Sequence, residues 1–171
     1  VFVTGMGVIS AIGNNTSENL AQLRNSKTGI GKAQHIESNY AQTHPFAEVK
    51  CSTEELKSKL TLKSSKGFTR TDYIAFTALS EALEHSKLTP EEISSENTAF
   101  ISSSTIGGMC MTDQLYEDAN LISDGSEFVK SYPGSTHALK IAKEYKLSGI
   151  VDLINTACSS SANAIMLGAK L

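Results

Sequence analysis

The sequence predicts an α/β fold in which a mixed, mostly parallel sheet carries helices on both faces. Short runs rich in apolar and β-branched residues at Val1–Thr4, Thr98–Ser103 and Gly149–Asn155 are typical of strands. Segments with apolar residues at helical spacing lie between and after these runs. The resulting order is strand, helix, helix, strand, helices, strand, helix, and such alternation favours parallel central strands.

The first third of the chain is expected to begin with a strand and a helix, which a long polar stretch follows. Val1–Thr4 is expected to be a strand, and the side chains of Asn14–Ser17 offer several N-caps for a helix that follows. The stretch 27–66 is polar and is expected to be irregular. Within it we expect a short strand near Phe46–Val49 and a short helix near Thr53–Lys59.

The clearest helix begins at Thr71-Asp72. Its alanines predict close packing against a neighbouring backbone. At Thr89–Glu92, a capping threonine, a proline at the first helical position and two acids predict another helix start. The apolar stripe of the first of these helices consists of Ile74, Ala75, Ala78, Leu79, Ala82 and Leu83.

The last third continues the alternation. The strand at 98–103 leads into Ile106-Gly107-Gly108, and helices are expected at about 109–122 and 134–146. The strand at 149–155 then leads into a helix of small residues over Ser159–Leu171.

Composition narrows the class of protein. A net charge of −3 and an isoelectric point near 5.8, without a dominant basic stripe, argue against a nucleic-acid binder. The 171 residues suffice for one compact domain. The chain starts at Val1 inside an apolar run and stops at Leu171 inside an expected helix, so we expect a piece of a longer protein.

The cysteines predict neither a disulfide framework nor a metal site. Cys51, Cys110 and Cys158 are few, odd in number and widely spaced. We therefore expect a reducing cytoplasm as the location. Cys51 and Cys110 are expected to be ordinary packing residues.

Cys158 lies in a different context, within the segment 155–161. An apolar strand leads into a turn, and the cysteine stands where a helix begins. A helix N-terminus carries unpaired N–H groups and partial positive charge, which favour the nucleophilic thiolate. The same N–H groups can stabilise an oxyanion formed when a thiolate attacks an acyl carbonyl. The competing interpretation is a buried, inert cysteine.

The spacing around Cys158 decides between these interpretations. The segment resembles the active-site signature of the β-ketoacyl-acyl carrier protein synthases, and 156–161 is similar to the version found in polyketide ketosynthases. The signature positions are filled without a miss by Gly149, Ile154, Ala157, Cys158, Ser159, Ser160, Ser161 and Ile165.

The resemblance extends over the whole chain, 1–171. Val3–Ser10 with Gly13-Asn14 is similar to the family's opening strand and turn, and Arg70-Thr71-Asp72 and Ile106-Gly107-Gly108 fall at matching places. The resemblance implies one incomplete domain, the N-terminal half of a thiolase-like fold, in an enzyme that is a homodimer. It also implies that the strand at 149–155 lies near the dimer axis, and that a lone half would expose the face its partner covers.

The resemblance further implies a chemistry. Cys158 would hold an acyl group, and a malonyl unit on an acyl carrier protein would be condensed with it after decarboxylation. No cofactor is implied, since phosphopantetheine of the carrier holds the substrates, and no metal is expected. The implied acyl pocket contains Ile106, Gly107 and Gly108, and the implied contacts to the acidic carrier protein are Lys63, Lys66 and Arg70.

The histidines of the chain do not match this chemistry. In the family, two histidines and a lysine that assist decarboxylation come after the point where this chain ends. The four present here are therefore expected to be solvated surface residues: His35, His44, His85 and His137.

Other interpretations remain open at this stage. A thiolase shares the fold and the nucleophile but uses coenzyme A, whereas a non-catalytic partner subunit would lack the nucleophile. A stand-alone interaction domain with an incidental match is a third alternative. A dinucleotide site at Gly5–Ser10 is disfavoured by its missing third glycine, and a phosphate cradle at 106–108 lacks the lysine of a P-loop.

Overall fold

The computed structural model describes residues 1–171, which form two compact units. The first unit comprises Val1, Leu62–Asp72 and Leu88–Leu171, and the second comprises Phe2–Thr61 and Tyr73–Lys87. None of the helices is both long and apolar enough to cross a membrane. The helices are α1 (Thr16–Arg24), α2 (Thr53–Ser58), α3 (Arg70–Ser86), α4 (Pro90–Ile93), α5 (Thr112–Leu121), α6 (Thr136–Tyr145) and α7 (Ser160–Gly168), with the 3-10 turns η1 (Gly107–Met111), η2 (Val129–Ser131) and η3 (Ala157–Ser159).

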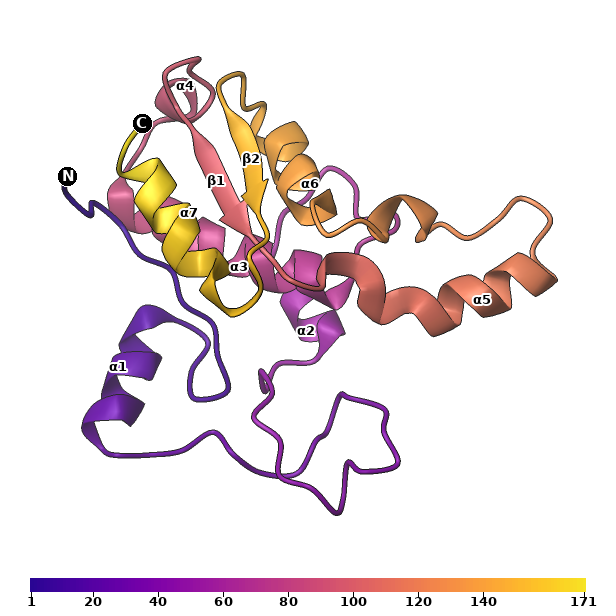
Figure 1. Ribbon diagram of the computed structural model, residues 1–171. Coiled ribbons are helices and arrows are strands. Elements are labelled where there is room, and N and C mark those ends of the chain that lie inside the picture. The colour runs from indigo at the N-terminus through magenta and orange to yellow at the C-terminus, as the bar shows by residue number, and fades with distance from the viewer. The chain divides into compact units, whose positions relative to one another are not determined.

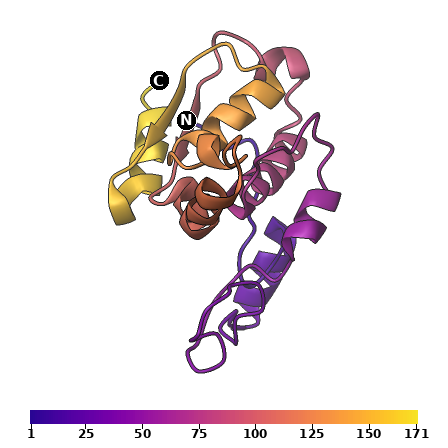
Figure 2. The same ribbon diagram turned by 90° about the vertical axis from the view of Figure 1, so that its right-hand side faces the viewer.

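The sheet of the first unit consists of two parallel strands, β1 (Phe100–Ser103) and β2 (Val151–Ile154). Their register pairs Ser103 with Ile154, so both strands end at the same edge. Helix α7 covers one face of this pair and α6 the other (Figure 1). Figure 2 shows the same pair of helices from the side. The predicted parallel α/β arrangement with helices on both faces is confirmed for this unit.

In the second unit, the segment after the N-terminus lies directly on the backbone of α3. A Cβ atom at Gly7 would lie 1.8 Å from the carbonyl oxygen of Ala78, and one at Gly5 would lie 2.3 Å from that of Ala82. The prediction that the alanines of this helix pack closely against a neighbouring backbone is confirmed. The two glycines of the Gly5–Ser10 pattern are therefore explained by helix packing.

A carboxylate of α3 fixes the same segment. Glu81 accepts hydrogen bonds from the backbone N–H of Val8 at 2.9 Å and of Thr16 at 2.7 Å. Burial raises the pKa of Glu81, but these two N–H donors, the Thr16 side chain and the charge of His85 together hold the pKa below its ordinary value.

The predicted helix starts are confirmed by their caps. Asn15 accepts a hydrogen bond from the Glu18 N–H at 2.8 Å at the start of α1. A reciprocal capping box opens α2, and another, between Thr89 and Glu92, opens α4. Short polar side chains followed three residues later by glutamate thus fixed these boundaries.

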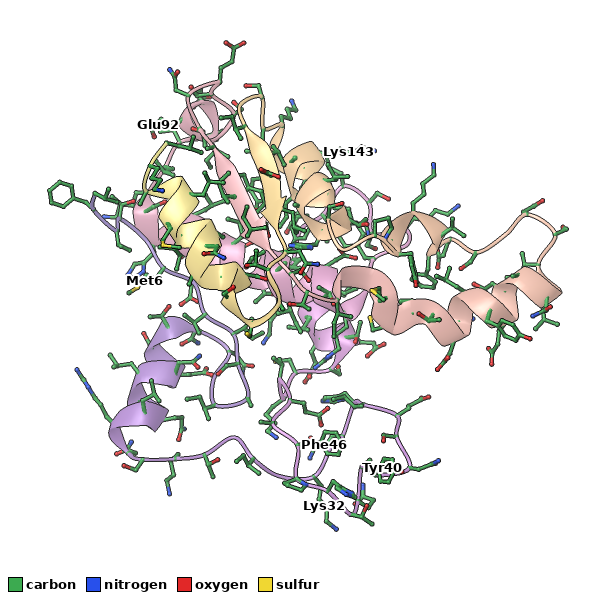
Figure 3. The ribbon with its side chains drawn as sticks, in the orientation of Figure 1. Met6, Lys32, Tyr40, Phe46, Glu92 and Lys143 are labelled. Atoms are coloured by element: carbon green, nitrogen blue, oxygen red, sulfur yellow. The ribbon has the colours of Figure 1, made fainter.

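Two predicted strands are wrong. Residues 1–9 form no strand, and Val1 and Phe2 are 98% and 94% exposed. A strand needs a neighbour to hydrogen-bond, and this apolar run has none among the described residues. In place of the predicted strand at 46–49, the structure has a single β-bridge between Gly31 and Phe46. Phe46 and Tyr40, both labelled in Figure 3, lie in this irregular stretch.

Candidate active site

Cys158 lies in η3, between the end of β2 and the start of α7. The predicted strand-to-helix junction is therefore present. The side chain of Cys158 is exposed, and no disulfide engages it. The interpretation of Cys158 as a buried residue is therefore wrong.

The residue before the cysteine has an unusual backbone. Ala157 adopts a φ of 52°, in the left-handed region. This conformation costs a non-glycine residue roughly 1–2 kcal/mol. It persists only where the surroundings fix it, and such residues often occur at functional sites.

The backbone N–H of Cys158 precedes the first hydrogen bond of the η3 turn. That bond runs from the Ser159 N–H to the carbonyl oxygen of Thr156, at 3.2 Å. The turn itself therefore does not use the Cys158 N–H, which is the donor expected to stabilise an oxyanion on an acyl group attached to the thiol.

Side chains of α7 hold this turn in place. The buried Ser160 hydroxyl accepts from the Thr156 N–H at 2.9 Å and donates to the carbonyl oxygen of Ala157 at 2.7 Å. Asn163 donates from Nδ2 to Oγ1 of Thr156 at 2.8 Å, and the Ser159 hydroxyl donates to the Thr156 carbonyl at 2.8 Å. The hydroxyls of Ser159 and Ser160 therefore bind the turn itself.

The end of β1 meets the same turn. Thr105 donates from Oγ1 to the carbonyl oxygen of Ala157 at 3.2 Å, and Asn155 donates from Nδ2 to the carbonyl oxygen of Thr105 at 3.5 Å. A third contact joins the hydroxyls of Ser103 and Ser161 at 3.2 Å. The segment that precedes Ile106-Gly107-Gly108 is thus hydrogen-bonded to the turn that contains Cys158.

The predicted pocket residues differ in character. Ile106 is 59% exposed, whereas Gly107 and Gly108 are buried. A Cβ at Gly107, which has a φ of 57°, would lie 2.4 Å from Cα of Gly134, and one at Gly108 would lie 1.5 Å from the carbonyl oxygen of Ser131. The two glycines let this turn pack against the backbone of 131–134, so Ile106 is the member of the three that offers a side chain.

A groove runs between β1 and α7. Cys158 is not among the residues that line it. Its lining residues are Ala99, Phe100, Ile101, Ser103, Ser161, Ala164, Ile165 and Gly168.

The three predicted carrier-binding residues lie before and at the start of α3. Lys63 and Lys66 are exposed, while Arg70 is half-buried. Lys63 also donates from Nζ to the carbonyl oxygen of Glu144 at 3.0 Å, and its ammonium lies 3.8 Å from that residue's carboxylate. Glu144 therefore offsets part of the positive charge, and Lys66 is the more openly presented cation.

The expectation of four solvated histidines is wrong for His137. His44 and His85 are exposed and His35 is half-buried, but His137 is 5% exposed on α6. Its Nε2 lies 2.7 Å from the Ser102 hydroxyl, and its Nδ1 makes no hydrogen bond of ordinary geometry. Burial lowers the pKa of His137, against the opposing effect of the Asp72 carboxylate.

The remaining cysteines differ from each other. Cys51 is buried, as predicted for a packing residue, and its thiol donates to Oδ1 of Asn14 at 3.1 Å. Cys110 is exposed, so the prediction that it packs is wrong. No group of three or more His, Cys, Asp or Glu side chains is arranged to hold a metal ion.

Three residues that hold the turn were not predicted from the sequence: Thr105, Asn155 and Asn163. A signal for Thr105 and Asn155 was present, because Thr105 follows one predicted strand and Asn155 ends another, and the carboxyl ends of adjacent parallel strands meet at one edge. Asn163 lies seven residues after Thr156, and no pattern of spacing predicts that contact.

Comparison with known protein families assigns the chain that contains this strand-to-helix junction to a family. The sequence model described as "Beta-ketoacyl synthase, N-terminal domain" matches residues 1–171. The chain belongs to this family. The ketoacyl synthases are transferases, and the resemblance inferred from the segment around Cys158 is thereby confirmed.

Curated relatives match at low identity. The 3-oxoacyl-[acyl-carrier-protein] synthase 1 of Escherichia coli (strain K12) is 27% identical over 168 residues, which are 95% of this chain and 41% of that protein. The chain thus spans about two fifths of the length of the curated relatives it matches.

Solved ketosynthase structures share the fold. The ishigamide ketosynthase/chain length factor matches with a TM-score of 0.75 at 20% identity, over 98% of this chain and 44% of that chain. A second match, with a TM-score of 0.66 at 20% identity, covers 98% of this chain and 40% of a chain described as "AntDE:AntF (apo): type II PKS acyl-carrier protein in complex with its ketosynthase bound to the hexaketide". The predicted thiolase-like fold is confirmed.

Proposed function

We propose that the protein containing this chain is a 3-oxoacyl-[acyl-carrier-protein] synthase that performs a decarboxylative Claisen condensation in fatty-acid or polyketide-type synthesis. The observation that carries this proposal is the exposed thiol of Cys158 on a fastened, strained turn at the start of α7, within a ketoacyl synthase domain.

The first half-reaction transfers an acyl group. The Cys158 thiolate attacks the carbonyl carbon of an acyl thioester, and the resulting oxyanion is stabilised by the Cys158 N–H. Collapse of this intermediate breaks the bond to the carrier sulfur, releases the carrier thiol and leaves an acyl group on Cys158. The fixed turn limits reorganisation as the charge develops.

The second half-reaction forms the new carbon–carbon bond. A malonyl thioester loses carbon dioxide, and its carbanion attacks the acyl carbonyl on Cys158, which releases the thiolate. Two histidines and a lysine would assist decarboxylation, as the family resemblance implies, and they lie outside this chain. We therefore expect the 171 residues alone to lack condensation activity.

The partner in both steps is an acyl carrier protein. Lys63, Lys66 and Arg70 supply positive charge next to one another in sequence, and carriers bearing phosphopantetheine are acidic, so local attraction would steer association. No cofactor of the enzyme's own is proposed. We also propose a homodimer and a cytoplasmic location, in which the Cys158 thiol stays reduced.

The acyl pocket begins at Ile106. Its exposed side chain belongs to the segment that Thr105 fastens to the Cys158 turn, so we propose that Ile106 contacts the acyl chain next to the thioester.

Two alternatives are kept. A thiolase-type acyltransferase would use coenzyme A thioesters without loss of carbon dioxide. A non-catalytic partner of a ketosynthase heterodimer is favoured by one observation only, the ketosynthase/chain length factor among the similar structures. Cys158 argues against this second alternative, because such partners lack the nucleophile.

The proposal is tested with the full-length protein, an acyl carrier thioester and a malonyl carrier thioester labelled with carbon-14 in its free carboxyl group. Wild type is expected to release labelled carbon dioxide and form the β-ketoacyl carrier, whereas Cys158→Ala is expected to form no condensation product. Condensation of two acyl-coenzyme A molecules without a malonyl substrate would favour the thiolase alternative. A wild-type protein that forms no product would favour the non-catalytic one.

A further inference from the structure

We propose that Thr105 is a positioning residue that orients the oxyanion-stabilising N–H of Cys158 through the peptide bond between Ala157 and Cys158. This inference rests on the proposed function, since it assigns a role to Thr105 in acylation of Cys158. It concerns a residue outside the active-site signature.

Ala157 and Cys158 share one peptide unit. The carbonyl oxygen of Ala157 and the N–H of Cys158 belong to one planar group, and the chain contains no cis peptide bond. The two groups therefore point in opposite directions across a rigid plane. A contact that fixes the carbonyl oxygen of Ala157 necessarily fixes the direction of the Cys158 N–H.

Three donors fix that oxygen. The Ser160 hydroxyl donates to it at 2.7 Å and the Thr105 hydroxyl at 3.2 Å, and the backbone N–H of Ser160 also donates to it. Ser160 is buried, comes from the helix directly after the turn and also binds the Thr156 N–H. Thr105 comes from the end of the other strand, so its hydrogen bond is the one that ties the peptide to a separate element.

The position of Thr105 is itself secured. Its carbonyl oxygen accepts a hydrogen bond from Nδ2 of Asn155 at 3.5 Å. Thr105 therefore both donates to and accepts from the segment 155–157 that leads to Cys158. Such anchoring matters because the φ of 52° at Ala157 is strained and needs support from its surroundings. Without the Thr105 hydroxyl, rotation of this peptide is opposed by fewer contacts.

The hydrogen bond also acts electronically. A donor on an amide carbonyl polarises the group and strengthens its N–H as a donor. The proposed oxyanion then receives a better oriented and more strongly polarised N–H. Thr105 is thus expected to affect steps that develop an oxyanion and to leave other reactions of the thiol unchanged.

The test compares two reactions of Cys158 in the full-length protein. Acylation by an acyl carrier thioester passes through an oxyanion, whereas alkylation by iodoacetamide displaces iodide without one. Thr105→Val removes the hydroxyl and keeps the branched shape, and Thr105→Ser keeps the hydroxyl. Cys158→Ala gives the background of both reactions.

We expect Thr105→Val to slow acylation on the order of tenfold, the effect of about one hydrogen bond, and to leave the alkylation rate unchanged. Thr105→Ser is expected to restore acylation to near the wild-type rate. Acylation of Thr105→Val at the wild-type rate would overturn the proposal. So would a parallel loss of both rates, because that indicates general distortion of the turn; Thr105→Ala provides a second variant without the bulk of valine.

A spectroscopic readout keeps this inference separate from the proposed function. Cysteine labelled with nitrogen-15 gives an amide resonance for Cys158, identified by its loss in Cys158→Ala. We expect its proton to shift upfield in Thr105→Val and to return in Thr105→Ser. If wild type is not acylated at Cys158, the proposed function fails. If the Cys158 amide resonance is the same in Thr105→Val and in wild type, the positioning role of Thr105 fails as well.

Discussion

The ammonium of Lys140 on α6 lies 2.6 Å from Oδ2 of Asp72 near the start of α3, and both side chains are largely buried, at 16% and 3% exposure. Lys140 also donates to the carbonyl oxygen of Gly67 at 2.7 Å and to Oγ of Ser131 at 2.8 Å. Asp72 additionally accepts from the N–H of Thr69 at 2.6 Å. The pair therefore joins three segments of the first unit through a satisfied polar cluster.

Removal of one partner of this pair should be more damaging than removal of both. Lys140→Met leaves the buried carboxylate of Asp72 without its cation, and we expect a loss of about 3–5 kcal/mol in the free energy of unfolding. The double variant Lys140→Met/Asp72→Leu should lose much less than the sum of the two single variants. Urea denaturation of all four proteins measures this, and additive losses would contradict the coupling.

His137 is expected to make stability depend on pH. Its pKa is lowered by burial from the ordinary 6.5, so the unfolded chain binds the proton more readily than the folded one. The contribution of neutral His137 to the free energy of unfolding is fully present above pH 6.5. It is lost as the pH falls from there toward the lowered pKa of the folded state. The slope from this one group is at most about 1.4 kcal/mol per pH unit.

The matched variant is His137→Gln, which cannot gain a proton. Thermal unfolding measured between about pH 8 and pH 5 should show a shallower fall for this variant than for wild type. Asp72 and Lys140 lie close enough to act on His137 electrostatically, and both remain in the variant. Identical pH profiles of the two proteins would rule out a contribution of His137.

The left-handed backbone of Ala157 predicts opposite effects of two substitutions. Ala157→Gly should raise the free energy of unfolding by up to about 1 kcal/mol, because glycine adopts a φ of 52° without steric strain. Ala157→Val should lower it by about 1–2 kcal/mol, because a branched side chain fits this conformation poorly. A more stable valine variant would contradict the backbone geometry assigned to the turn.

Positive charge at Lys63 and Lys66 should govern association with the carrier protein. The double charge reversal Lys63→Glu/Lys66→Glu is expected to slow association roughly tenfold at low salt, and the difference should shrink as salt screens the charges. Lys27→Glu reverses another exposed lysine, which lies in the second unit, and serves as the control. Surface plasmon resonance measures the association rates. If Lys27→Glu slows association as much per reversed charge as Lys63→Glu/Lys66→Glu does, a local docking site at Lys63 and Lys66 is refuted.

Much of the fold could be predicted because its signals are local. Asn15 and Thr89 mark helix starts through contacts within one turn, and the alanines of α3 mark a face against which a backbone packs. The run at Val1–Thr4 was mispredicted as a strand because β-propensity does not reveal whether a partner is present. The burial of His137 likewise depends on a contact with Ser102, 35 residues away.

In the candidate site, too, the features that are local in sequence could be predicted and the contacts between distant residues could not. The spacing around Cys158 predicted the family, which is confirmed, and pointed to Cys158 as the candidate nucleophile, because the signature is contiguous in sequence. The hydroxyl of Thr105 is 52 residues from its acceptor on Ala157, and only the shared end of two parallel strands brings them together. The glycines at 107 and 108 were expected to line a pocket, but their role in backbone packing becomes visible only once 131–134 are placed.

The central claim is that Cys158 accepts the acyl group, and peptide mapping tests it most directly. The full-length protein is incubated with an acyl carrier thioester labelled in its acyl chain, quenched in acid and digested, and the labelled peptide is identified by mass spectrometry. We expect label on the peptide that contains Cys158, its loss in Cys158→Ala, and none on the peptides of Cys51 and Cys110. An unlabelled Cys158 peptide in a protein that still forms condensation product would contradict it.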